Sequence, residues 1–113
     1  MLKHTYRRVV LRSGERTKVR LVVDFEEEGC GLLAAFLNGE VPNFHREILE
    51  TLGPVAQGRK ETGEFRGNRC RLIVFRRMAV LMDGLEEAGL PMCKLPTEEL
   101  IALIEEWLEE KER

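Results

Sequence analysis

Residues 60–82 read KETGEFRGNRCRLIVFRRMAVLM and contain three β-favouring runs separated by two short polar turns. Gly67-Asn68 stands between the first two runs, and Gly-Asn supplies the positive φ angles that a tight hairpin needs. Arg76-Arg77 precedes the third run, residues 78–82, whose length favours a buried strand over a helix. The sequence therefore predicts a three-stranded antiparallel meander.

A separate hairpin is predicted nearer the amino end. Residues 3–12 and 17–25 are rich in branched residues, and the turn signal Ser13-Gly14-Glu15-Arg16 joins them. We expect these two runs to pair as antiparallel strands.

Helical spacing of apolar residues appears between the hairpin and the meander. Leucine and phenylalanine recur at helical intervals after Glu26–Glu28, whose charges suit a helix amino end, and Gly39 is the expected stop. A shorter helix is predicted over residues 43–52, with Gly53-Pro54 as its stop signal.

The last predicted helix begins at Thr97 and runs to about Glu110. Threonine is a good capping residue, and glutamates follow it in the first turn. Residues 84–95, which precede this helix, are expected to form a loop. The apolar stripe of the helix consists of Leu100, Ile101, Ile104, Trp107 and Leu108.

These segments predict an α+β fold. The order is two strands, a helix, a shorter second helix, three strands and a final helix. We expect an antiparallel sheet of about five strands with two or three helices packed on one face. With 113 residues, 43% of them hydrophobic, the chain fits a single domain over residues 1–113 with enough apolar surface to fold alone.

Charge alternates along the chain in blocks that follow the predicted elements. Residues 1–24 carry seven basic and two acidic side chains, and residues 58–84 carry seven and three. Residues 25–57 carry one basic and six acidic side chains, and residues 85–113 carry three and nine. The net charge of −2 therefore conceals basic strands and acidic helices.

Four glutamates mark the acidic candidate site. Glu105, Glu106, Glu109 and Glu110 stack as like-charge pairs along the last helix, near its negative carboxyl end. Only Lys111 and Arg113 offset them nearby. Such an arrangement disfavours folding locally, so it indicates either a docking face for a basic protein partner or a solvated helix surface.

Three arginines mark an alternative, basic site. Arg66, Arg69 and Arg71 flank the Gly-Asn turn and would hold phosphates if the chain were an RNA-binding module that uses its sheet. They would equally serve to solubilise an open sheet face. The pI near 5.8 is far from that of a typical nucleic-acid binder.

The sequence contains few residues that could form a catalytic or metal-binding site. Cys30, Cys70 and Cys93 match neither a disulfide framework nor a zinc motif, so we expect reduced thiols and no metal or other cofactor. A ribonuclease built on His4 or His45 would have only two histidines, 41 residues apart. No apolar run is long enough to span a membrane, and the amino end is not a signal sequence, so a cytoplasmic binding protein without enzymatic activity is expected.

The second half of the chain resembles a known group of proteins. The segments that carry this resemblance are EFRGNRCRLI (64–73), LMD (81–83), LPTEEL (95–100) and IEEWL (104–108). They are similar to small bacterial immunity proteins, the cognate inhibitors in contact-dependent inhibition and related polymorphic toxin systems, many of which guard against tRNA-cleaving nucleases. The resemblance implies no catalysis, no cofactor and a toxin domain bound through charge complementarity. Arg76-Arg77 departs from the acidic or neutral turn expected there.

Overall fold

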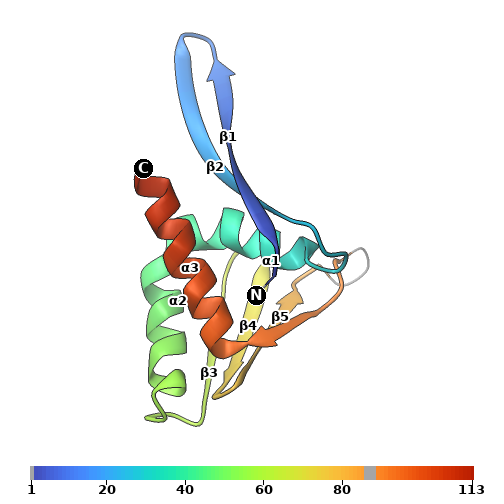
Figure 1. The fold of residues 1–113 in the computed structure, drawn as a ribbon, viewed down its shortest axis with the longest axis vertical. Coiled ribbons are helices and arrows are strands. Elements are labelled where there is room, and N and C mark those ends of the chain that lie inside the picture. Colours follow the sequence, from blue (N-terminus) through green and yellow to red (C-terminus); the bar gives the residue numbers. More distant parts are fainter. Residues whose placement is uncertain (1, 86–88) are drawn as a thin grey trace.

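The computed structural model describes residues 2–85 and 89–113 and contains two separate β-sheets together with a helical layer (Figure 1). The elements in chain order are β1 (His4–Ser13), β2 (Arg16–Phe25), α1 (Gly31–Ala35), the π-helical turn η1 (Phe36–Glu40), α2 (Val41–Ala56), β3 (Thr62–Arg66), β4 (Cys70–Phe75), β5 (Met78–Asp83), β6 (Cys93–Pro96) and α3 (Thr97–Glu112).

The α+β prediction is confirmed, but the single sheet of about five strands is wrong. β3, β4, β5 and β6 pair in sequence order as an antiparallel meander, and β1 pairs only with β2. The meander gains its fourth strand within the predicted loop 84–95, where Leu81 pairs with Cys93 and Ala79 with Leu95. β6 has only four residues, too few for an alternating pattern to stand out in the sequence. Residues 86–88 of the predicted loop lie outside the described residues.

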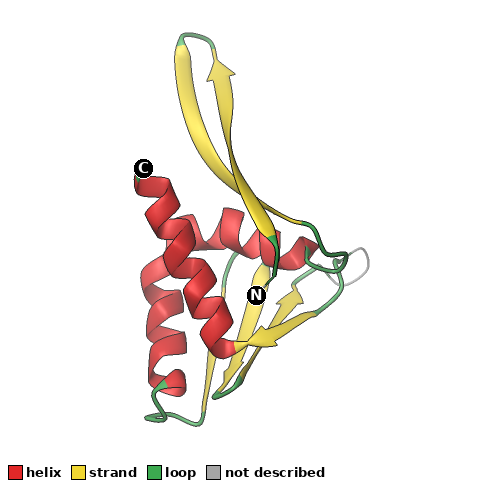
Figure 2. Cartoon of the chain, in the orientation of Figure 1, coloured by secondary structure: helices red, strands yellow, loops and turns green. Residues whose placement is uncertain are grey.

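The helices cover one face of the four-stranded sheet, as predicted (Figure 2). Burial alternates along β4, where Cys70, Leu72 and Val74 are buried and the residues between them are not. The opposite face is left partly open to solvent. The residues of the meander buried beneath the helices are Phe65, Cys70, Leu72, Val74, Ala79, Leu81, Cys93 and Leu95.

The helical region begins and ends later than the sequence predicts. Glu26–Glu28 lie ahead of α1, because Gly29, at φ 85°, turns the chain before the first helical residue, Gly31. Gly39 does not stop the helix but lies inside η1, and Pro54 lies inside α2, which continues to Ala56. Helical backbone thus extends over most of residues 31–56, with a kink at Phe44.

The two predicted hairpin turns have different physical origins. Gly14, at φ 62°, occupies the first central position of the two-residue turn between β1 and β2, where a type II′ turn requires glycine. The β3–β4 turn is also present, but Gly67 and Asn68 have no positive φ, so our reason for that turn is wrong. A Cβ at residue 67 would instead overlap the carboxylate of Glu40, which is buried beneath the turn.

The β1–β2 hairpin projects from the body as an extended arm, residues 4–25, and gives the molecule its long dimension of 49 Å (Figure 1). Only Leu21 and Val23 of the arm are buried, and residues 10–20 are all exposed. Asn38 fixes the base of the arm, since its side chain accepts a hydrogen bond from Val23 N at 2.9 Å and donates one to Val23 O at 3.0 Å.

Helix α3 carries the predicted core tryptophan. Trp107 is 2% exposed, and Ile101 and Leu108 are only partly buried because Leu100, Leu103 and Ile104 occupy the centre of the buried stripe. Thr97 does not cap the helix through its side chain. Its hydroxyl instead donates a hydrogen bond of 2.6 Å to Phe75 O in β4, which ties the start of α3 to the sheet.

Candidate functional site

The four glutamates of α3 divide between two faces of the helix. Glu105 and Glu109 are exposed, whereas Glu106 and Glu110 are partly buried. Glu106 Oε1 lies 2.6 Å from His4 Nε2 of the arm, and Glu110 Oε1 lies 3.5 Å from an Arg113 guanidinium nitrogen. The sequence therefore located an acidic helix correctly, but of these four glutamates only Glu105 and Glu109 are exposed without an ion-pair partner among the described residues.

His4 joins the base of the arm to α3. Its ring packs against Tyr6 and Phe25, and its Nδ1 lies 2.7 Å from Leu2 O. Burial lowers the His4 pKa, but the hydrogen bonds to Glu106 and Leu2 O and the charge of Glu106 outweigh it, so the pKa is raised above its usual 6.5. The pair with Glu106 is therefore an ionic attachment of the arm when His4 is protonated.

Arg8 of β1 makes a second attachment, at the carboxyl end of α3. Its guanidinium donates hydrogen bonds to Glu110 O at 2.7 Å and to Arg113 O at 3.1 Å. Terminal carbonyls of a helix lack intrahelical partners, and this end of the helix is negatively polarised, so a cation is favourable here. No local pattern indicates that a residue of the arm meets a helix 102 positions later.

The arginines of the alternative site are neutralised by carboxylates. Arg66 Nε and Arg71 Nε both donate to Glu64 Oε1 at 2.7 Å, and Arg69 Nη2 donates to Asp83 at 3.0 Å. Hydrogen bonds from Arg71 and Arg66 lower the pKa of Glu64 to about 2. The structure brings these arginines together around the β3–β4 hairpin, but as partners of acidic residues, which leaves the RNA-binding reading without support from free positive charge.

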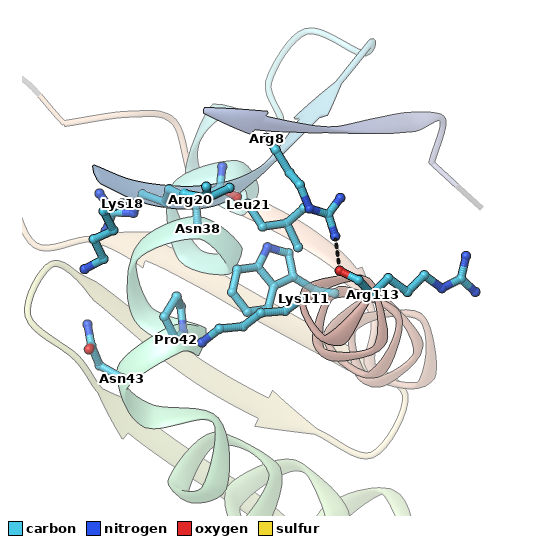
Figure 3. Close-up of a pocket in the computed structure, with 11 residues that line it drawn as sticks. Arg8, Lys18, Arg20, Leu21, Asn38, Pro42, Asn43, Lys111 and Arg113 are labelled. Carbon is cyan, nitrogen blue, oxygen red and sulfur yellow. Dashed lines mark hydrogen bonds between the residues drawn. The ribbon is translucent and has the colours of Figure 1, made fainter. Parts of the chain in front are cut away.

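Basic side chains also gather in a pocket between the arm and the helices (Figure 3), where all of them except Arg113 lack a salt bridge within the described residues. The pocket has a volume of about 480 Å³. Arg8, Lys18 and Arg20 reach it from the arm, and Lys111 and Arg113 reach it from the end of α3. Its other lining residues are Val19, Leu21, Asn38, Pro42, Asn43 and Trp107.

This pocket was not predicted, although residues 1–24 carry a strong excess of basic side chains. Their charge was expected on a single sheet shared with the meander. The hairpin forms its own sheet and contacts α3. The basic side chains of the arm therefore lie close to those at the carboxyl end of the helix.

The remaining reactive residues are separated or buried. Cys30, Cys70 and Cys93 are free and buried, and burial raises the pKa of Cys70 to about 11, so its thiol is poorly nucleophilic. His45 is exposed on α2, while His4 is held in the arm. Across residues 2–85 and 89–113, His, Cys, Asp and Glu form no group of three or more that would hold a metal ion.

Comparison with known proteins assigns the chain to a family. It is 32% identical over 107 residues to a Bacillus cereus protein named Immunity protein, and the match covers 94% of this chain and 86% of that one. The chain therefore belongs to the immunity proteins. No protein-family model matches it, and no solved structure matches it. Within the described part of the chain, no helix is both long and apolar enough to cross a membrane.

Proposed function

We propose that this chain is a cytoplasmic inhibitor that neutralises a cognate nuclease toxin by binding it, and that it performs no catalysis itself. Membership of the immunity proteins supports the inhibitory role. A nuclease that grips RNA needs a basic cleft, and carboxylates of an inhibitor can occupy such a cleft in place of phosphates.

The acidic surface of α3 is the proposed contact with the toxin, and the exposure of Glu105 and Glu109 is the observation that carries this proposal. These carboxylates are one helical turn apart, so they repel each other and gain nothing from their own fold. A basic partner relieves that repulsion. Glu106 and Glu110 belong to the same proposed contact and extend it toward the arm, where they also hold His4 and Arg113.

The negative charge of this surface is the reason for proposing a nuclease toxin, because a nuclease needs a basic cleft to grip RNA. Complementary charge raises the rate of association and fixes the orientation of the partners, and both effects suit an inhibitor that must capture a toxin before it acts. The partner is therefore expected to be a basic toxin domain.

The test compares two double variants with the same change of charge. E105Q/E109Q should lower both the association rate and the affinity for the toxin domain, and should weaken protection of cells that express the toxin. E47Q/E50Q removes two exposed carboxylates from α2 and serves as the control. Equal toxin binding by both variants would show that the outer face of α3 is only a solvated surface.

The toxin itself has to be found first. Carboxyl-terminal toxin domains encoded beside the gene should be expressed with and without this chain. A domain that arrests growth, and whose effect this chain relieves, is the partner for the affinity measurements. A toxin domain that arrests growth by cleaving RNA would support the nuclease class, and one with another activity would contradict it.

A further inference from the structure

The basic pocket between the arm and α3 has hydrogen-bond donors and positive charge, but among the described residues it lacks a carboxylate side chain of its own. Within the described residues, no aspartate or glutamate lines it, and Arg8, Lys18, Arg20 and Lys111 form no salt bridge. This differs from the meander, where Arg66, Arg69 and Arg71 all meet carboxylates. Four cations without a salt bridge in the described structure thus line one hollow that has no carboxylate side chain of its own.

Trp107 adds a second and independent observation. It lines the pocket, it is 2% exposed, and its indole N–H is buried without a hydrogen-bond partner in the described structure. A buried donor without an acceptor destabilises the folded state, so such a group in a native protein requires an explanation. Lys111 Nζ lies 5.6 Å from the centre of the same ring, which adds a positive charge near the indole.

We infer that this pocket binds carboxylate side chains from an acidic segment of the toxin. The inference rests on the proposed function, because it takes the toxin as the partner. Carboxylates supply the acceptor that Trp107 lacks in the described structure and negative charge opposite to that of the cations in the pocket. The volume of about 480 Å³ suits one or two acidic side chains rather than a whole folded element.

A protein segment fits the pocket better than a nucleic acid does. Trp107 is too deeply buried to offer a face on which a base could stack. An extended polyanion leaving the pocket along α3 would also meet Glu105 and Glu109, whereas a short acidic segment would not. The net charge of −2 adds to this repulsion at longer range.

The pocket and the acidic surface of α3 would together fix the orientation of the toxin. They carry opposite charge and lie on the same helix and the arm beside it, so a partner with a basic surface and a neighbouring acidic segment can dock in one direction only. Reversing the partner would place like charges together, which costs several kcal/mol in typical interfaces.

The sole tryptophan makes the pocket directly observable. Titration of the whole chain with a hexaglutamate peptide at low salt should change the fluorescence of Trp107 and saturate. In K18Q/R20Q the affinity for the peptide should fall by about tenfold or more, as expected when two cations are removed from one site. The control is R12Q/R16Q, which removes two exposed cations from the tip of the same arm and should change the affinity by less than about twofold.

Several outcomes would overturn the inference. They are the absence of a fluorescence change with the peptide at low salt, equal losses of affinity in K18Q/R20Q and R12Q/R16Q, and saturable binding of a single-stranded RNA oligonucleotide in place of the peptide.

The toxin supplies the second readout. If wild-type chain protects cells and K18Q/R20Q protects less than R12Q/R16Q, the pocket contacts the toxin. If wild type and K18Q/R20Q protect equally, the pocket inference fails while the proposed function stands. If wild type neither binds nor neutralises any encoded toxin domain, the proposed function itself fails, whatever the peptide does.

Discussion

Glu40 lies beneath the β3–β4 turn because residue 67 has no side chain. Its Oε1 accepts a hydrogen bond of 3.2 Å from Asn68 N, its Oε2 has no partner in the described structure, and the residue is only 3% exposed. Burial of a carboxylate is costly unless hydrogen bonds or opposite charges compensate it, so Glu40 depends on the turn that packs over it. Gly67 is therefore required by packing and not by its backbone conformation.

Gly67→Ala should lower the free energy of unfolding by about 1–3 kcal/mol, because the new methyl group displaces the Glu40 carboxylate and its hydrogen bond. Urea denaturation measures the change. The control is Gly39→Ala in η1, where a Cβ meets nothing within 4 Å and the next residue is not a proline, so the better helix former should leave stability unchanged or raise it by up to about 1 kcal/mol. Unchanged stability in Gly67→Ala would contradict the role of Glu40.

His4 predicts a pH dependence of stability. Its pKa is raised in the folded chain, so its contribution is fully present below its unfolded value of 6.5 and is lost as the pH rises through the higher folded pKa. The free energy of unfolding of wild type should therefore decrease over this range relative to that of His4→Gln. Denaturant titrations from pH 5.5 to about 8.5 test this. His45→Gln, at an exposed position on α2, should keep the wild-type slope.

Helix α3 is the element on which the core and both proposed contacts depend. Trp107 belongs to the buried core and also lines the basic pocket. Trp107→Ala should cost about 3–5 kcal/mol, as expected for removal of a buried aromatic side chain. Trp107→Phe should cost clearly less, because the indole N–H makes no hydrogen bond in the described structure. Thermal unfolding compares the two, and equal losses would show that the N–H is satisfied.

Elements with strong local signals were the predictable part of the fold. The Gly14 turn and the apolar stripe around Trp107 are encoded within a few residues, and both are present. Helix ends were less predictable, since Gly39 and Pro54 lie within helical backbone that tertiary packing supports. β6 depends on pairing with β5, so its four residues gave no signal of their own.

The candidate sites, like the fold, were predictable only where the signal lies within a short stretch of sequence. The acidic residues of α3 were visible as a cluster, but the burial of Glu106 against His4 joins residues 102 positions apart. The basic pocket combines side chains from the arm and from the carboxyl end of α3. No local pattern encodes such a meeting, because it depends on how the separate hairpin lies against the helix.

At the scale of the whole molecule, the tip of the arm should be separable from folding. Because Leu11 pairs with Lys18, residues 12–17 can be replaced by Asn-Gly without a change of register. All of the removed residues are exposed, so stability should change by no more than about 1 kcal/mol. Hexaglutamate should still bind, since Lys18 and Arg20 remain. A large loss of stability would show that the tip of the arm contributes to the fold.

The exposed outer half of the arm has an evolutionary consequence. Residues 10–20 contribute nothing to the buried core, so selection for folding constrains them weakly, while the base is held by His4, Arg8 and Asn38. Substitutions can accumulate at the tip without the loss of stability that follows substitution in a core. The fold thus joins a body whose packing restricts substitution to a segment whose surface can change at little cost in stability, so under the proposed function the arm can adapt to a different toxin while the body stays the same.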